Sequence, residues 1–530
     1  MRLYNTLGGQ KEELQTLEPH KAKMYVCGPT TYNYIHLGNA RPLVVFDTVR
    51  RYLAYRGYQV TYVQNFTDVD DKIINRAREE GSDPLELACN YIQAYYQDAD
   101  ALNIMRADRH PRVSQHMPEI IAAVQGLLDK GFAYEVDGDV YYRVSAFKDY
   151  GKLSGRLLED MLAGARVEVD ERKENAADFA LWKKAKAGEP AWESPWGSGR
   201  PGWHIECSVM STKYLGDSFD IHGGGSDLIF PHHENEIAQA EALTGKPFVR
   251  YWMHNGFITV NNEKMSKSLG NFFILRDILA QYPADVVRFY LISTHYRSPL
   301  DFDDGKLEEA RKALGRLKTT LLLAEEFMAG NQTGHHPADE QEPFIKALQE
   351  QRGEFIAAMD DDFNTAKAVS HLFEMSHLIN SYVAAADKNE ALHQAAVREA
   401  YRLFAALGDV LGIFIQPQHD SAAAVGQVLQ ILAALRSQAR TEKDYQLADM
   451  IRDFFARIEV RVEDTPDGSR FRFEQPPRLA VLIEELIRLR NSFKAGQAFA
   501  KADMIRDRLH EAGVILEDAR EGVRWKIADA

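Results

Sequence analysis

Two lysines, Lys264 and Lys267, lie three residues apart in a stretch of small and polar residues between Gly256 and Gly270. This composition predicts a mobile loop, and two cations on such a loop can stabilise the negative charge that develops on a polyphosphate leaving group. Lysine pairs in polar loops are also common on ordinary solvated surfaces. The pair therefore indicates chemistry only in combination with other motifs.

A second set of residues could bind a metal ion through two thiols, one imidazole and one carboxylate: Cys27, Cys207, His232 and Glu236. If Pro231 occupies the first turn of a helix, His232 and Glu236 share one face of it. Such a pair can hold one zinc ion, and two thiolates from strand ends would complete a four-ligand set. Two other imidazoles compete for the same role, those of His204 and His233. A pair of buried free thiols, beside a helix whose histidines only cap it or face solvent, is the alternative interpretation.

A glycine-rich turn follows a predicted strand that begins at Phe219. Gly223, Gly224 and Gly225 have no side chains, so the backbone there can approach a flat or anionic ligand closely. Asp227 behind them could accept hydrogen bonds from ribose hydroxyls. Because such turns also occur without nucleotides, this one supports a nucleotide site only alongside other signals.

The elements that must position these residues form a βαβ unit. Residues 23–29 predict a buried strand ending in a Gly-Pro turn, a helix begins near Gly38, and residues 59–66 predict the next strand. A right-handed crossover between parallel strands implies an α/β fold with a Rossmann-like sheet. Ligands bind beyond the carboxyl ends of such strands, where His36 and Thr67 lie. The backbone amides at the helix start form a phosphate site.

The rest of the chain adds an insertion, a bundle and a repeat. Residues 111–200 look like an insertion with an amphipathic helix and a hairpin across Asp137 and Gly138. Residues 306–413 have helical periodicity throughout and predict a helical bundle. The sequence Ala-Asp-Met-Ile-Arg-Asp then occurs twice, starting at Ala448 and again 54 residues later at Ala502. Each copy predicts two helices and a hairpin, which is a small α+β module.

Composition narrows the functional classes. The chain has 530 residues, of which 45% are hydrophobic and 27% charged, as in ordinary soluble proteins of several domains. No apolar run reaches about 18 residues and the N-terminus lacks a signal-peptide layout, so we expect a cytoplasmic protein without a membrane segment. Three cysteines are too few for a disulfide framework, which fits a reducing cytosol. A net charge of −15 argues against a charge-driven nucleic-acid binder, but not against RNA recognised through local shape.

Together these motifs resemble those of the bacterial cysteinyl-tRNA synthetase family, within the class I aminoacyl-tRNA synthetases. The resemblance covers essentially the first 415 residues and continues into the tail. It is carried by the two-part signature of class I enzymes, His36-x-Gly38 followed much later by Lys264-Met-Ser-Lys267-Ser. It is also carried by four further segments: residues 27–30, 65–73, 202–208 and 222–236.

The resemblance implies a zinc ion that binds the thiolate of substrate L-cysteine. Its implied ligands are Cys27, Cys207, His232 and Glu236. Packing alone distinguishes cysteine from serine poorly, because the side chains differ by one atom. A soft thiolate on zinc is strongly preferred over a hydroxyl. By the same resemblance the amino-acid pocket includes Thr30, Thr67, Trp203 and His222, and the ATP site includes Gly38, Gly224 and Asp227.

The implied reaction is attack of the cysteine carboxylate on the α-phosphorus of ATP, with Mg2+, followed by transfer of cysteine from the adenylate to tRNA(Cys). Lys267 is the expected main cation on the leaving phosphates, with Lys264 assisting. His36 is expected to stabilise the pentavalent phosphorus. Asn39 stands where class I enzymes commonly have a second histidine, and an amide can donate a hydrogen bond but carries no charge. We predict a contact role for Asn39.

The resemblance also assigns the domains. The catalytic sheet is expected in two halves, residues 1–110 and 201–250. The insertion between them, residues 111–200, is expected to contact the acceptor end of the tRNA. The region of the lysine loop, residues 251–310, is expected to contact the tRNA stem, and the helical bundle, residues 311–415, is expected to bind that stem. The family usually ends in one small module, whereas here copies are expected at residues 425–474 and 478–530. We expect the second copy to bind the anticodon, with Trp525 stacking on a base or, alternatively, packing in its own module. We expect a monomer.

Two other functions use the same motifs. A ligase that joins cysteine to an amino-sugar in mycothiol synthesis would share the sheet and the zinc, but it would lack the tRNA-binding tail. A non-catalytic tRNA-binding paralogue would have a broken signature. In this chain the signature residues are all present: His36, Gly38, Lys264 and Lys267.

Overall fold

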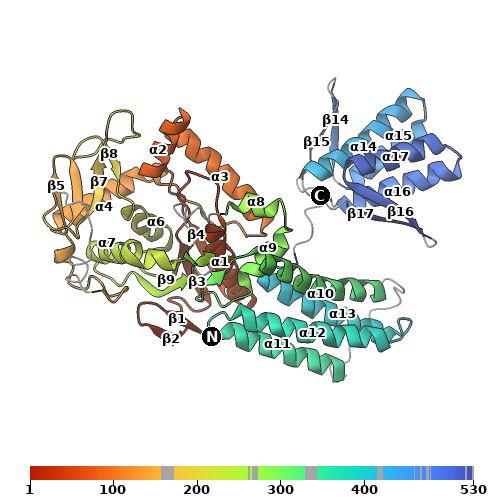
Figure 1. The fold of residues 1–530 in the computed structure, drawn as a ribbon. Helices are drawn as coiled ribbons and strands as arrows, with labels where there is room; N and C mark the ends of the chain where they lie inside the picture. Colours follow the sequence, from red (N-terminus) through yellow and green to blue (C-terminus); the bar gives the residue numbers. More distant parts are fainter. Residues whose placement is uncertain are drawn as a thin grey trace. The chain divides into compact units, whose positions relative to one another are not determined.

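The computed structural model describes residues 1–156, 172–260, 263–264, 273–328, 343–414, 422–458, 460–465, 468–472, 477, 479–519 and 522–527. The chain divides into two compact units, Met1–Phe414 and Ile415–Ala530, which are described separately. Their elements are labelled in Figure 1. Within the described part of the chain, no helix is both long enough and apolar enough to cross a membrane.

The first unit is built on a parallel sheet of four strands in the order β10-β9-β3-β4. The strands are β3 (Lys21–Val26), β4 (Gln59–Gln64), β9 (Phe219–Gly225) and β10 (Val249–Asn255). Helix α1 (Leu37–Tyr55) connects β3 to β4, and helix α7 (Glu234–Thr244) connects β9 to β10. The predicted βαβ unit and parallel α/β sheet are therefore confirmed.

The apolar character of these segments explains the arrangement. Every residue of β9 before its last glycine is buried, as expected for a strand covered on both faces. Helix α1 is buried over most of its length and packs against α9 (Ala284–Ile292) and α13 (Ala391–Leu411) (Figure 1). The sheet and α1 thus share one continuous core with the helices that follow.

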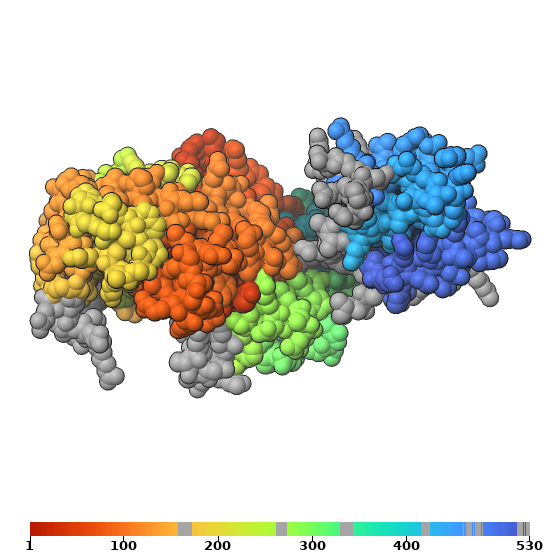
Figure 2. Space-filling view, turned by 90° about the horizontal axis from the view of Figure 1, so that it is seen from above, coloured from red at the N-terminus to blue at the C-terminus, as the bar shows by residue number. Residues whose placement is uncertain are grey.

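An insertion separates the two halves of the sheet. Helices α2 (Asp71–Glu80), α3 (Pro84–Ala101) and α4 (Met117–Asp129) precede an antiparallel sheet in the order β5-β6-β7-β8. Its strands are β5 (Ala133–Val136), β6 (Asp139–Tyr142), β7 (Phe179–Lys184) and β8 (Gly199–Pro201). The predicted hairpin is present, and Asp137 and Gly138 have φ values of 53° and 88°, as its tight turn requires. Figure 2 shows this insertion, in orange and yellow, as one continuous surface of the first unit.

Short elements complete the part of the first unit around the parallel sheet. Helix α6 (Ile205–Leu215) starts the second half, and helix α8 (Leu275–Leu279) precedes α9. A small sheet in the order β12-β11-β13 contains β11 (Ile258–Val260), β12 (Glu263–Lys264) and β13 (Leu300–Asp301). A hairpin of β1 (Arg2–Asn5) and β2 (Gln10–Glu13) lies at the N-terminus, and short turns of helix occur at Val113–Gln115, Val144–Ala146, Ser226–Leu228 and Ile229–His233.

The predicted helical bundle consists of α10 (Asp304–Met328), α11 (Pro343–Asp360), α12 (Thr365–Ala385) and α13. Its helices bury apolar residues at helical spacing; in α10 these include Leu307, Leu314 and Leu317. In Figure 1 the four helices lie side by side and run nearly parallel to one another. The all-helical pattern of the sequence is confirmed here.

The second unit contains both copies of the repeat. The first copy is α14 (Ala422–Thr441), α15 (Tyr445–Arg457), β14 (Arg461–Thr465) and β15 (Gly468–Arg472). The second is α16 (Leu479–Ala495), α17 (Phe499–Glu511), β16 (Val514–Ala519) and β17 (Gly522–Ile527). Each copy has the predicted two helices and hairpin, and α15 and α17 begin at equivalent positions of the repeat. The small α+β modules are confirmed.

The two copies share a single hydrophobic core. Buried residues of both copies, among them Leu432, Ile451, Leu482 and Ile505, belong to one cluster, and α14 packs against α16. An ion pair between Lys501 and Glu442, with Nζ and Oε2 2.5 Å apart, also joins the copies. The copies therefore form one body, and the functional division into seven segments stays a prediction.

Candidate active site and metal centre

A cleft of about 330 Å³ opens at the carboxyl ends of β3, β9 and β10. The predicted site residues that line it are Cys27, Thr30, His36, Gly38, Asn39, Trp203 and Asp227. This is the position at which open parallel sheets bind ligands, and the volume suits a small molecule. The structure therefore brings seven of the predicted site residues into one cavity.

His36 and Asn39 form a reciprocal cap at the start of α1. The backbone amide of Asn39 donates to Nδ1 of His36 over 3.2 Å, and the backbone amide of His36 donates to Oδ1 of Asn39 over 3.3 Å. Because Nδ1 accepts, a neutral His36 ring carries its proton on Nε2 and can donate it to a phosphate oxygen. The Asn39 side chain thus orders the helix start, whose amides and dipole favour an anion.

Gly38 has a second feature that suits ligand contact. Pro42 lies four residues further along α1 and has no N–H, so the carbonyl of Gly38 lacks its usual helical donor. Both residues line the cleft. The chain therefore places a backbone acceptor without its normal partner beside the helix start.

The four predicted metal ligands come together beside this cleft. Their ligand atoms lie within 4.8 Å of one another: Cys27, Cys207, His232 and Glu236. Cys27 follows β3, Cys207 lies in α6, and Glu236 is in the first turn of α7. Nε2 of His232 lies 3.1 Å from Oε1 of Glu236, so the two side chains face each other as predicted. His232 precedes the regular helix α7, however, and does not lie inside it.

The two thiols have the spacing that zinc requires. The Sγ atoms of Cys27 and Cys207 are 3.8 Å apart. Two thiolates at about 2.3 Å from one zinc ion in tetrahedral geometry lie about 3.8 Å apart. Burial acts to raise the pKa of Cys207, but the hydrogen bond from Cys27 and the neighbouring His232 lower that pKa to about 6. The residues present therefore fit a zinc ion.

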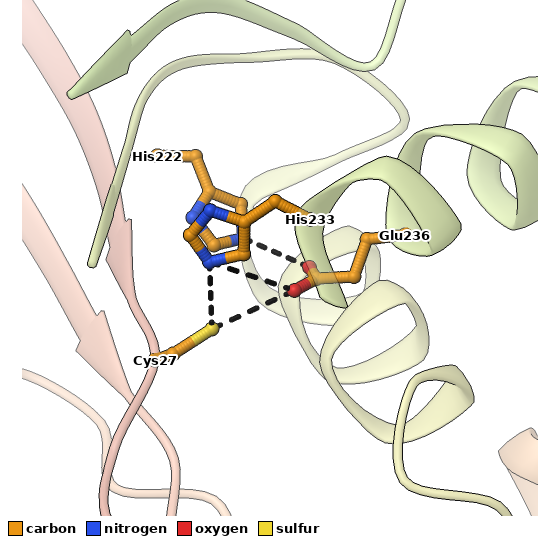
Figure 3. Close-up of side chains that lie close together, drawn as sticks. All are labelled: Cys27, His222, His233 and Glu236. Carbon is orange, nitrogen blue, oxygen red and sulfur yellow. Dashed lines mark hydrogen bonds and ion pairs between the residues drawn. The ribbon is translucent and has the colours of Figure 1, made fainter. Parts of the chain in front are cut away.

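A second group of ligand atoms overlaps the first. It consists of Cys27, His222, His233 and Glu236, also within 4.8 Å of one another (Figure 3). Nε2 of His222 lies 2.8 Å from Oε2 of Glu236, and Nδ1 of His233 lies 2.8 Å from Nε2 of His254. The first group differs in offering the second thiolate that zinc prefers. It is therefore the better candidate for a metal site.

Buried histidines surround the ligands, and the sequence analysis did not predict these contacts. His222 orients Glu236, and Nδ1 of His204 lies 2.9 Å from Nδ1 of His232. Burial opposes ionisation of Glu236, but His222 and His232 lower the pKa of its carboxyl to about 2. Such outer contacts fix the direction of a ligand and keep it charged. His204, a competing candidate, contacts the predicted ligand His232.

A longer chain of contacts reaches Cys27 from the N-terminal hairpin. Oγ1 of Thr6 lies 2.8 Å from Nδ1 of His254, whose Nε2 contacts His233, and Nε2 of His233 lies 3.4 Å from Sγ of Cys27. Burial lowers the pKa of His254 to about 3 and that of His233 well below its usual value. Both rings are therefore neutral, and they supply fixed hydrogen-bonding atoms rather than charge.

Besides the predicted metal ligands Cys207, His232 and Glu236, three further predicted site residues with described side chains lie outside the lining of the cleft. The hydroxyl of Thr67 donates to Glu206, and His222 lies behind Glu236. A Cβ atom at Gly224 would lie 2.8 Å from Cε1 of His233, so this glycine makes room for an imidazole. In this structure Thr67, His222 and Gly224 therefore contact or make room for other residues of the site and do not face the cleft.

The remaining predicted site residues are Lys264, Lys267 and Trp203. The backbone of Lys264 pairs with Thr259 in the small sheet, while its side chain and all of Lys267 lie outside the described residues. Trp203 is 41% exposed, and its ring centroid lies 4.3 Å from that of His232. Trp203 therefore covers the predicted metal ligand His232 at the edge of the cleft.

Comparison with known proteins agrees with this geometry. A family model described as the catalytic domain of class I (C) tRNA synthetases matches residues 13–312, and a DALR domain model matches residues 354–416. A cysteine–tRNA ligase of Desulforamulus reducens is 57% identical over 483 residues, covering 89% of this chain and 99% of that protein. One of Pelotomaculum thermopropionicum is 58% identical over 489 residues with the same coverage. The chain belongs to the cysteine–tRNA ligase family.

Solved structures support the fold. Methionyl-tRNA synthetase of Mycobacterium tuberculosis, in complex with methionyl-adenylate, matches with a TM-score of 0.55 at 16% identity, covering 78% of this chain and 94% of that one. The fold is thus that of class I synthetases. The two cysteine–tRNA ligases are matched over 99% of their length by 89% of this chain. About a tenth of this chain is therefore without a counterpart in them, close to the length of one 54-residue repeat.

Proposed function

We propose that this chain is a cysteine–tRNA ligase that activates L-cysteine with ATP and transfers it to the 3′ end of tRNA(Cys). The observation that carries the proposal is the group of two thiols, one imidazole and one carboxylate at the edge of a cleft that also contains a helix N-terminus. The thiols suit selection of a sulfur-containing substrate, and the helix start suits a phosphate.

We propose zinc as the metal and Cys27, Cys207, His232 and Glu236 as its ligands. The ion would supply a soft Lewis acid that prefers a thiolate to a hydroxyl. The chain's own residues hold the ligand set in place: His222 keeps Glu236 charged, His204 contacts His232, and Trp203 covers it. Selection at the metal makes a separate editing site unnecessary.

In the first step the cysteine carboxylate attacks the α-phosphorus of ATP. A carboxylate O–P bond forms, and the bond from the α-phosphorus to the bridging oxygen breaks, releasing pyrophosphate as its Mg2+ complex. His36 donates from Nε2 to the phosphorus oxygens, and the amides that begin α1 add positive potential. Lys267 is our proposed main cation on the pyrophosphate, with Lys264 assisting. Gly38 and Asp227 are our proposed contacts for adenine and ribose.

In the second step the adenylate is transferred to the terminal ribose of tRNA. We propose that the insertion and the bundle contact the acceptor end and the stem, and that the second unit binds the anticodon. Trp525 is half-buried and packs against the core of that unit, opposite Leu516 in the hairpin. Stacking on a base would therefore use only the exposed part of its ring. The enzyme is proposed to act as a monomer in the cytoplasm, where reducing conditions preserve its thiols.

The proposal is tested by two assays on the full chain. Exchange of labelled pyrophosphate into ATP should require L-cysteine and should not occur with L-serine. Cysteine should then appear on tRNA(Cys). Adenylate formation followed by transfer to an amino-sugar but not to tRNA would contradict the proposal in favour of a small-acceptor ligase. Absence of exchange with cysteine would contradict it outright.

A further inference from the structure

Arg41 lies in α1, five residues after His36, and its side chain is fully buried. Among the described residues no carboxylate pairs with its guanidinium, which instead donates to backbone carbonyls. Nη1 donates to the oxygens of Gly256 and Phe257, both at 2.8 Å, and Nη2 donates to the oxygen of Ser298 at 2.6 Å and to that of His295 at 3.5 Å. Burying a cation without a counter-charge is costly, so an arrangement that keeps one needs a reason.

The three closest carbonyls belong to the segments that lead into the small sheet. Gly256 and Phe257 join β10 to β11, and Ser298 lies two residues before β13. Strand β11 pairs in parallel with β13 and antiparallel with β12, where Thr259 is opposite Lys264. Arg41 therefore holds together the beginnings of two strands, and the pairing of those strands places the backbone of Lys264.

The connection at Gly256 is too tight for any side chain. Its backbone amide donates to the carbonyl of Tyr296 over 2.8 Å. A Cβ atom at this position would lie 2.6 Å from the oxygen of Ser298 and 2.7 Å from that of Arg297. The two chain segments thus meet at backbone distance, and the guanidinium binds both of them from the side of α1.

The other end of the segment that carries Lys264 and Lys267 is attached to the same helix start. The amide of Leu37 donates to the carbonyl of Phe273, and the amide of Leu275 donates to that of Ile35, both over 3.0 Å. Leu37 is the first residue of α1, and Ile35 lies just before the helix. Arg41 thus binds the residues before β11, and these two hydrogen bonds attach Phe273 and Leu275 to the helix start. The helix that carries His36 and Gly38 therefore positions both ends of the segment that carries the two lysines.

We propose that Arg41 is a positioning residue that holds the small sheet of β11, β12 and β13 against the start of α1, so that Lys264, Lys267 and the helix start act on one triphosphate. The inference rests on the proposed function, in which those lysines stabilise the leaving pyrophosphate. A planar guanidinium donates in fixed directions from two separate terminal nitrogens, and here Nη1 and Nη2 bind different chain segments. The donors of a lysine ammonium all lie on a single nitrogen, so lysine cannot reproduce this arrangement. Small displacements of groups around a reacting centre can reduce rates by about a hundredfold.

The test compares Arg41→Met and Arg41→Lys with Arg50→Met. Arg50 is the control because it is also a buried arginine of α1 that donates to a carbonyl, that of Arg106; it pairs in addition with Asp108 and lies away from the small sheet. In cysteine-dependent pyrophosphate exchange, both Arg41 variants should lose at least tenfold in kcat, with zinc content and the KM for cysteine within about twofold of native. Arg50→Met should lose thermal stability while its kcat stays native.

The outcomes separate the two proposals. Exchange by the native chain establishes its activity, and its absence would contradict the proposed function rather than this inference. A native kcat in Arg41→Met would overturn the role of Arg41. A fall in kcat, zinc content and cysteine affinity together, matched by Arg50→Met, would also overturn it, because it would indicate general damage. If Arg41→Met does not fold, Gly256→Ala decides, since its Cβ displaces the same junction; it should lower kcat without changing the KM for cysteine.

Discussion

The Sγ atom of Cys27 lies 3.8 Å from the Sγ atom of Cys207, although 180 residues separate them along the chain. Cys27 follows the first strand of the sheet, and Cys207 lies in the helix that begins its second half. A metal ion bound to both would therefore join the two halves of the catalytic domain. Metal binding and the stability of this domain are coupled in such an arrangement.

Removal of the metal should destabilise only one of the two units. Calorimetry of the full chain should show that chelation lowers the unfolding temperature of the unit with the metal site. The transition of the second unit, which has its own hydrophobic core, should stay in place. Cys207→Ser should reproduce the shift without chelator. Equal shifts of both transitions, or none, would contradict the assigned site.

His222→Gln should weaken metal binding without removing a ligand. The imidazole contacts Glu236 at 2.8 Å and helps to keep its carboxyl ionised. Loss of such an outer contact typically costs about 10- to 100-fold in metal affinity. Competition with a chromophoric chelator measures the change. His393→Gln, in the helical bundle, is the control and should bind the metal with native affinity.

Asn39 allows stability and catalysis to be separated. Asn39→Ala removes the acceptor for the amide of His36 and should cost about 1 kcal/mol of stability, the usual net value of one hydrogen bond. Asn39→Asp retains an acceptor and should be as stable as the native chain. Its negative charge beside the phosphate site should nevertheless raise the KM for ATP. Native ATP kinetics in Asn39→Asp would show that the triphosphate does not approach this end of α1.

His110 predicts a pH dependence of stability. The amide of Ala107 donates to its Nε2 over 3.2 Å, and its Nδ1 lies 3.0 Å from the carbonyl oxygen of Gln64, so the ring is held neutral. Burial lowers the pKa of His110 from 6.5 to about 4. As the pH falls from about 6.5 to about 4, His110 binds a proton in the unfolded chain but stays neutral in the folded one. The free energy of unfolding therefore decreases, by at most about 3 kcal/mol.

Denaturant titrations at about pH 7.5 and about pH 5 measure this effect. In His110→Gln the loss of stability between the two conditions should be smaller by about 2 kcal/mol than in the native chain. An identical loss in both proteins would mean that His110 titrates normally in the folded state.

Local patterns in the sequence predicted much of the fold. The apolar run of β3, the helix after Gly38 and the turn at Asp137 and Gly138 are short-range signals, and the structure contains the elements that they predict. The internal repeat likewise predicted equivalent helices and hairpins in the second unit. The candidate metal-ligand set could be predicted from the sequence, because helical spacing and thiol chemistry limit which residues can bind one ion. Two histidines remained as competing candidates.

Contacts between distant residues were not predictable in the same way. No local pattern indicates that Arg41 binds carbonyls more than 200 positions later, or that Thr6 reaches Cys27 through two histidines. The shared core of the two repeat copies was missed for a similar reason, because each copy alone has the pattern of a complete module. Thr67 and Gly224 carry the residue types of ligand contacts, yet one pairs with Glu206 and the other makes room for His233.

The most direct test of metal-based selection is the spectrum of the cobalt(II)-substituted enzyme. Cobalt bound to two thiolates absorbs in the near ultraviolet through sulfur-to-metal charge transfer, and a third thiolate increases that absorption. Addition of L-cysteine should therefore intensify the band, and L-serine should leave it unchanged. Cys207→Ser, if it retains cobalt, should start from a weaker band. An unchanged spectrum with saturating cysteine, in an enzyme that still forms cysteinyl-adenylate, would contradict selection at the metal.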